Sequence, residues 1–143
     1  MPPRGADPAH MLAMAAHVQG RVHALNVTDG SRAVMRMSSV AACKLLIEAG
    51  AEPVLQLACR DRNRIALQAD LLGAHALGIR NLLCLTGDPV RSGDQPLVRP
   101  VNELESVKLL QQVEAFNQGE DPVKGSLPDG ATALFAGLSL IHI

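Results

Sequence analysis

The chain has 143 residues, of which 48% are hydrophobic and 19% are charged, and its formal net charge is −1. This composition is typical of one globular domain with a substantial core, and it argues against disorder. The lack of a basic excess argues against a nucleic-acid partner. No apolar run approaches the ~20 residues of a membrane-spanning helix, so no membrane partner is expected either.

Cysteine usage and the first residues indicate the compartment. Cys43 falls on a predicted helix face, and Cys59 and Cys84 fall in apolar strands, which favours buried free thiols in a reducing environment. No Cys or His spacing fits a zinc site, so no metal is expected. The apolar segment of a signal peptide is not seen. The sequence therefore predicts a cytoplasmic protein without a metal centre.

Apolar periodicity and capping residues predict four helices that alternate with four strands. Asp7 is expected as N-cap with Pro8 in the first turn, and Asp61 as the cap of the third helix. Asn102 with Glu105 forms a capping-box-like start of the fourth helix. The expected elements are a helix over 8–18, a strand over 22–28, a helix from 38 or 39 to 50, a strand over 53–59, a helix over 64–77, a strand over 81–85, a helix over 102–116, a polar loop over 119–130 and a strand over 131–137.

This regular alternation with short connections predicts a parallel sheet with helices on the outside. The spacing of the strands fits a (β/α) barrel about as well as a doubly wound sheet. A complete TIM barrel takes roughly 250 residues, so four strands correspond to about half of one. We predict an α/β fold, a partial (β/α)8 TIM barrel of about four β/α units.

Both ends of the sequence suggest truncation. Residues 138–143 (LSLIHI) match the translation of a transposon-end adapter used in sequencing libraries. We therefore expect a partial barrel domain over residues 1–137 and a non-native segment over residues 138–143. At the other end, Pro2 and Pro3 precede a capped helix, where a barrel would have its first strand.

Five short stretches carry a family resemblance through their order and spacing, and they are residues 26–29, 56–63, 67–70, 78–81 and 85–89. With these stretches the chain resembles the catalytic domain of methylenetetrahydrofolate reductase, a flavin-dependent barrel enzyme. The resemblance implies an oxidoreductase that reduces 5,10-methylenetetrahydrofolate to 5-methyltetrahydrofolate for methionine synthesis. It also implies FAD as cofactor, NADH or NADPH as electron donor, a small-molecule folate substrate and a homo-oligomeric parent protein.

The resemblance also implies site residues at three strand ends. Asp88 matches the acid beside flavin and folate and is the candidate catalytic residue, and Gly87 would let the backbone approach a flat ring. Thr28 matches a flavin contact. Gln56 stands where many members carry His, and an amide can replace a neutral imidazole as a hydrogen-bond partner. Thr86 stands where members often carry Arg, which removes a cation from the expected cofactor-binding set.

Two further groups of residues bear on the chemistry. Arg60, Arg62 and Arg64 precede or begin a helix, and they form either a solvated charged face or a site for an anion such as a flavin phosphate. The family's proton donor is a Glu just before the Pro-Pro pair, where this chain has Met1. We therefore expect this polypeptide by itself to be inactive in folate reduction.

Three alternatives remain open at this point. A flavodoxin-like module would carry a phosphate loop after its first strand, and no such pattern occurs. Another folate or pterin barrel would leave unexplained the recurrence of Thr28, Gln56 and Asp88 at successive strand ends. A non-catalytic interaction fragment would expose open sheet edges that pair with other chains.

Overall fold

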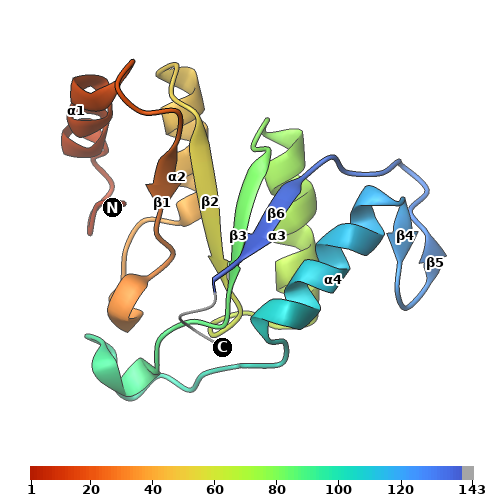
Figure 1. Cartoon of the computed structure of the whole chain (residues 1–143). Helices are drawn as coiled ribbons and strands as arrows, with labels where there is room; N and C mark the ends of the chain where they lie inside the picture. Colours follow the sequence, from red (N-terminus) through yellow and green to blue (C-terminus); the bar gives the residue numbers. More distant parts are fainter. Residues whose placement is uncertain (140–143) are drawn as a thin grey trace.

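The computed structural model describes residues 1–139 and contains a four-stranded parallel sheet (Figure 1). The strands lie in the order β1, β2, β3, β6, and every neighbouring pair is parallel. Among the described residues the sheet stays open and closes into no barrel. The α/β fold of about four β/α units is therefore confirmed. The strands are β1 (Leu25–Val27), β2 (Pro53–Ala58), β3 (Asn81–Leu85) and β6 (Phe135–Leu138).

Helices cover one face of this sheet. The long helices are α1 (Ala9–Val18), α2 (Ser39–Glu48), α3 (Arg64–Ala76) and α4 (Ser106–Asn117), and Figure 1 shows α2 and α3 behind the sheet. Alternate strand residues point into the core between sheet and helices, where apolar burial stabilises the fold. The fully buried apolar residues include Leu55, Leu57, Leu67, Leu71, Cys84 and Leu109.

The opposite face of the sheet is partly open. Gln56 in β2 and Leu83 in β3 are half-buried there, and the register places them side by side. Phe135 at the start of β6 is 78% exposed. In a closed barrel this face would be the interior, whose side chains pack as a core, and only the side chains at its carboxyl edge would meet a ligand.

The first strand is shorter than predicted because of its position at the edge of the sheet. β1 begins at Leu25, opposite Pro53, which is also the first residue of β2. Residues 22–24 have no neighbouring strand to pair with, and Val22 is exposed. The predicted strand over 22–28 was therefore too long.

The last strand also begins later than predicted. Residues 131–134 bind the end of α4 instead of the sheet. The Thr132 N–H donates to the carbonyl of Phe116 at 2.9 Å, and the Leu134 N–H donates to Oδ1 of Asn117 at 2.9 Å. Pairing with β3 starts only at Phe135, and it continues through Leu138, one residue past the predicted domain boundary.

Two of the predicted helix starts were wrong in detail. The carboxylate of Asp61 is bound to Arg60, so Asn63 takes its place and accepts a hydrogen bond from the Ala66 N–H at 2.9 Å. α4 begins at Ser106, later than the predicted start after Asn102, whose φ of +45° is not helical.

The first helix start differs by one position. Pro8 is the N-cap of α1 rather than its first helical residue, and the carboxylate of Asp7 accepts a hydrogen bond from the Ala9 N–H at 2.9 Å. Asp7 thus provides an acceptor for one of the unpaired N–H groups of the first turn, although it precedes the N-cap residue by one position.

The predicted polar loop over 119–130 contains a hairpin. β4 (Glu120–Asp121) pairs antiparallel with β5 (Gly125–Ser126). Asp121 accepts a hydrogen bond from the Val123 N–H, and Gly125 adopts a φ of +91°, both of which suit a tight turn. The sequence contained these turn residues, but their two flanking strands are too short to show a pattern.

Metal-binding clusters, membrane-spanning helices and the end of the chain were also subjects of the sequence-based predictions. No cluster of three or more His, Cys, Asp or Glu side chains that could hold a metal occurs within residues 1–139. No helix in this part of the chain is long and apolar enough to cross a membrane. Of the segment expected to be non-native, residues 140–143 lie outside the described residues, and its origin stays a prediction.

Candidate functional site

The structure brings Thr28 and Gln56 together on the open face of the sheet. Val27 pairs with Leu55, so the next residues, Thr28 and Gln56, are neighbours near the carboxyl ends of β1 and β2. Thr28 is half-buried, and its Oγ1 is buried and has no hydrogen-bond partner. A buried hydroxyl without a partner is costly, and it favours a ligand that would supply the missing hydrogen bond.

Thr86 does not join this pair. Its Oγ1 lies 3.2 Å from Oγ of Ser106 and accepts a hydrogen bond from the Ser106 N–H at 3.4 Å. Ser106 is the first residue of α4, so this contact ties the end of β3 to the helix side of the sheet. The predicted cofactor contact of Thr86 stays a prediction, and the hydroxyl already has a structural partner.

Gly87 occupies a position that other residues would strain. Its φ is +102°, and a Cβ built on it would lie 2.9 Å from Cβ of Arg60 and 3.4 Å from Cβ of Ala58. Glycine is therefore required here by both backbone conformation and space. The sequence suggested that the backbone at Gly87 approaches a flat ring closely. Within this chain, the group that it approaches closely is Arg60, which follows β2.

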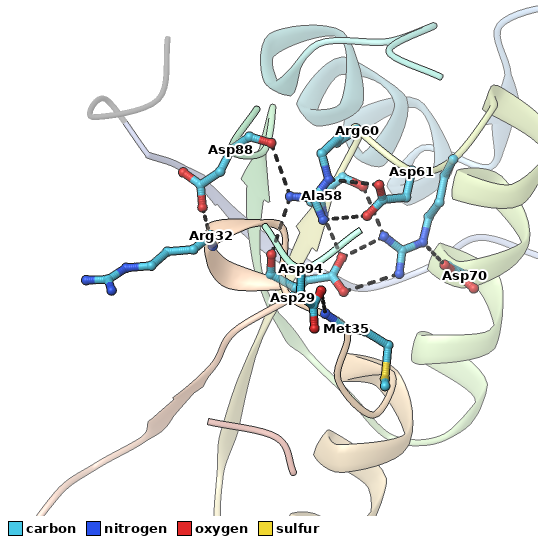
Figure 2. Close-up of polar contacts among 11 residues, drawn as sticks. Asp29, Arg32, Met35, Ala58, Arg60, Asp61, Asp70, Asp88 and Asp94 are labelled. Carbon is cyan, nitrogen blue, oxygen red and sulfur yellow. Dashed lines mark hydrogen bonds and ion pairs between the residues drawn. The ribbon is translucent and has the colours of Figure 1, made fainter. Parts of the chain in front are cut away.

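Asp88 is held at both its carboxylate and its main chain. Oδ2 accepts a hydrogen bond from the Arg32 N–H at 2.6 Å, and its carbonyl accepts one from Nη1 of Arg60 at 3.2 Å (Figure 2). In Figure 2 the Arg32 side chain points away from this cluster. The candidate catalytic carboxylate is thus fixed beside η1 (Ser31–Ala33), the short helix that follows β1.

Arg60 is buried, which corrects the interpretation of the three arginines as one solvated face. Only 5% of its surface is exposed, and its Nε donates to Oδ1 of Asp61 at 2.8 Å. Nη1 also donates to the carbonyl of Gly30 at 3.3 Å. The hydrogen bond to Asp61 raises the pKa of the guanidinium, against the opposite effect of burial, so the side chain stays charged.

Arg62 forms a second, partly buried network with two carboxylates. Its Nη1 lies 2.6 Å from Oδ2 of Asp29, and its Nε lies 2.8 Å from Oδ2 of Asp70 (Figure 2). Burial lowers its pKa, but the charges of Asp29 and Asp70 outweigh that effect and raise it. Arg64 differs, because its side chain is exposed near Glu103. Neither Arg60 nor Arg62 is free to bind an anion without losing a carboxylate.

Asp29 and Asp94 help to hold the loops around the candidate site, and the sequence did not indicate this role. Oδ2 of Asp29 accepts a hydrogen bond from the Ala58 N–H at 2.9 Å, which extends the pairing of β2 past the end of β1. Asp94 accepts one from the Met35 N–H at 3.0 Å and pairs with Arg4. The only available signal was a pair of acidic residues in loops, which is also typical of ordinary turns.

The loops after β1 and β3 enclose two cavities at the carboxyl edge. Arg60, Val90 and Val98 line both, and Thr86, Gly87 and Asp88 line the larger one, of about 440 Å³. The predicted site residues therefore fall into two groups. Thr28 and Gln56 lie on the open sheet face, whereas the three residues after β3 lie against Arg60.

The family model described as methylenetetrahydrofolate reductase matches residues 1–125. The chain belongs to the methylenetetrahydrofolate reductase family. The match spans β1 to β3, all four long helices and the two groups of site residues described above. It places the chain in a folate-related oxidoreductase family, whose members are generally flavin-dependent. No curated protein matches the chain significantly.

In this family member the three cysteines are buried and free, as predicted. Burial raises the pKa of Cys43 and Cys84 to about 12 and that of Cys59 to about 11, from 9.0. None is therefore a thiolate at neutral pH, and none offers a ready nucleophile or metal ligand.

We expect these thiols to resist modification in the folded chain. With a disulfide reagent at pH 8, the native protein should react far more slowly than the protein in denaturant, where all three thiols should titrate. Because the unfolded thiols ionise near pH 9, their contribution to stability is intact below that pH and falls between about 9 and 12. Fast stoichiometric labelling of the native chain would contradict this assignment.

Proposed function

We propose that this chain is part of an enzyme that reduces 5,10-methylenetetrahydrofolate to 5-methyltetrahydrofolate, with FAD as cofactor and NADH or NADPH as electron donor. The observation that supports this most directly is the unpartnered hydroxyl of Thr28 beside Gln56, at the carboxyl edge of a sheet in a chain of this family. In (β/α) barrels that edge carries the active site. A cytoplasmic location and a role in methionine metabolism are part of the proposal.

The described residues fit a flavin at this face. The Oγ1 atom of Thr28 lacks a partner that a polar flavin edge would provide, and the half-buried Gln56 can both donate and accept a hydrogen bond. When bound, FAD would supply the hydride chemistry. The amide of Gln56 cannot titrate, so its hydrogen bonding would stay the same across the physiological pH range. Asp88 would contribute a fixed negative charge.

A substitution of Thr28 separates binding from folding. Thr28→Val keeps the shape but removes the unpartnered hydroxyl, so we expect stability to be unchanged or slightly higher. FAD affinity should fall about fivefold to tenfold, in line with about 1–1.5 kcal/mol for one hydrogen bond. Fluorescence quenching of FAD on titration with protein gives the affinity, and urea unfolding gives the stability.

Thr132→Val is the matched control. Thr132 is buried too, but its hydroxyl donates to Oδ1 of Asn117 at 2.7 Å. Its replacement should lower stability by about 1 kcal/mol and leave FAD affinity unchanged. An absence of FAD binding by the parent chain would reject the proposed cofactor. Equal affinities for the parent and Thr28→Val would remove Thr28 from the site.

We also propose that the chain does not complete the reduction by itself. No strand of the four-stranded sheet contains a glutamate, and Glu52 lies at its amino edge, where it accepts a hydrogen bond from Asn81. Glu103 and Glu105 lie near the carboxyl edge, but they are exposed in the loop before α4, and Glu103 already accepts a hydrogen bond from the Arg64 N–H at 3.1 Å. We therefore propose that the proton donor is not among the described glutamates. We expect no steady oxidation of NADH or NADPH with methylenetetrahydrofolate, and sustained turnover would contradict this.

A homo-oligomeric state of the parent protein is also part of the proposal, and it rests on the family resemblance alone. Phe135 exposes 78% of its surface on the open face of the sheet. That face would be the interior of a closed barrel, so this exposure gives no support to an oligomer.

A further inference from the structure

Arg60 is unusual because one guanidinium bonds in two directions. Nε and Nη2 bind the carboxylate of the adjacent Asp61, which compensates the buried charge locally. The remaining nitrogen, Nη1, donates to two main-chain carbonyls, those of Gly30 at 3.3 Å and Asp88 at 3.2 Å. These two carbonyls belong to the loops that follow β1 and β3, so one side chain joins both loops to the end of β2.

The segment 86–88 is held by Arg60 at every residue. The Arg60 N–H donates to the carbonyl of Thr86 at 3.0 Å, and the guanidinium binds the carbonyl of Asp88. Between them, Gly87 lies so close to Cβ of Arg60 that no side chain fits. The carbonyl of Arg60 in turn accepts a hydrogen bond from the Val101 N–H at 2.8 Å. The loop that carries Asp88 therefore has little freedom relative to Arg60.

The carboxylate of Asp88 depends on the same arginine through a second route. It accepts a hydrogen bond from the N–H of Arg32, which has a φ of +58° in the loop that begins at Gly30. A Cβ on Gly30 would lie 2.8 Å from Nη2 of Arg60, so this loop also packs directly on the guanidinium. Arg60 thus binds both the loop that donates the hydrogen bond and the loop that accepts it.

We propose that Arg60 is a positioning residue that fixes the Asp88 carboxylate, by binding the carbonyls of Gly30 and Asp88 at once. The role of that carboxylate toward flavin and folate rests on the proposed function, whereas the positioning itself does not. A lysine cannot reproduce the arrangement, because its ammonium lacks the planar fork that serves a carboxylate on one side and two carbonyls on the other. Arg60→Lys therefore keeps the positive charge but cannot bind the Asp61 carboxylate and the carbonyls of Gly30 and Asp88 at the same time.

The first test needs no ligand. Hydrogen exchange of the Arg32 amide, followed by NMR, reports its bond to Asp88, and the amide of the buried Ile79, bonded to the carbonyl of Ala74, serves as internal reference. In Arg60→Lys we expect the protection of Arg32 relative to Ile79 to fall about tenfold or more. In Arg62→Lys, which alters a neighbouring buried arginine bonded to Asp29 and Asp70, the ratio should stay within about twofold.

Two outcomes would overturn the proposal in this test. One is an unchanged ratio in Arg60→Lys, and the other is an equal fall in both variants. If Arg60→Lys does not fold, Asp61→Asn takes its place, because it weakens the anchor of the guanidinium at a side chain that is 46% exposed. In Asp61→Asn the protection of the Arg32 amide relative to Ile79 should also fall, by less than in Arg60→Lys. An unchanged protection ratio would count against the proposal.

The second test is a double-mutant cycle on FAD affinity with Arg60→Lys and Asp88→Asn. If Arg60 acts through Asp88, Arg60→Lys weakens binding about tenfold in the parent chain but less than about twofold in the Asp88→Asn background. An equal loss in both backgrounds indicates a general structural effect and overturns the inference. A parent chain that binds no FAD rejects the proposed function instead, and the exchange of the Arg32 amide then decides the role of Arg60 alone.

Discussion

Replacement of Gly87 by alanine is expected to destabilise the chain by about 3 kcal/mol or more. The new methyl group would meet Cβ of Arg60 at 2.9 Å, and the φ of +102° is unfavourable for any residue with a Cβ. Backbone strain of this kind costs about 1–3 kcal/mol and overpacking of a filled site adds about 1–3 kcal/mol. Urea unfolding of the parent and the variant measures the difference.

Gly73→Ala provides the matched control for this substitution. Gly73 lies inside α3, and a Cβ built on it meets nothing within 4 Å. Because alanine favours a helix over glycine, this variant should be more stable by about 0.5–1 kcal/mol. If both variants changed stability in the same direction, the close contact between Gly87 and Arg60 would be wrong.

The sequence predicted the central β-α-β unit because its signals are local. A near-continuous apolar run marks β2, apolar residues at the spacing of one helix face mark α3, and Gly78 follows the helix as its C′ residue. The observed β3 has the predicted bounds, and β2 and α3 each end one residue before the predicted end. β2 and β3 pair with each other from Val54 and Asn81 to Ala58 and Leu85, so their bounds do not depend on where the outer strands start.

The outer strands could not be predicted as well because their lengths are set by partners. β1 can pair only where β2 is extended, and Thr132 and Leu134 bind Phe116 and Asn117 in α4 before the chain joins the sheet. A β-branched, apolar run indicates that a strand can form, but the hydrogen bonds of its neighbours decide where it starts.

The candidate site was predicted in part. The parallel register pairs Val27 with Leu55, so the residues that follow them, Thr28 and Gln56, lie next to each other, whereas their contact with a flavin stays a prediction. Sequence patterns failed for Arg60 and Arg62, because a charged residue near a helix start is usually solvated. Only the structure shows that Asp61 neutralises one arginine while Asp29 and Asp70 neutralise the other. The acidic residues of these loops therefore stabilise the site by compensating the charges of the two arginines.

Replacement of Asp29 by alanine is expected to have the largest effect of any change in these ion pairs. It removes a carboxylate that binds Arg62 and that also accepts the hydrogen bond of the Ala58 N–H. Both side chains of the pair are mostly buried, with 17% and 11% of their surfaces exposed. Breaking a buried pair costs about 3–5 kcal/mol when the other charge is left without a partner, but Arg62 keeps its pair with Asp70. The Ala58 N–H loses its acceptor, which adds about 1–3 kcal/mol, so we expect the free energy of unfolding to fall by about 3 kcal/mol in total.

Glu48→Ala removes an acidic partner on the surface and serves as the control. Glu48 pairs with Lys44 at 3.3 Å within α2, and 58% and 38% of the two side chains are exposed. Exposed pairs of this kind contribute about 0.5 kcal/mol, so this variant should unfold almost at the urea concentration of the parent. A loss of similar size in Asp29→Ala and Glu48→Ala would show that Asp29 is solvated. The extension of β2 by its carboxylate would then have to be abandoned, together with the buried pairing of Arg62.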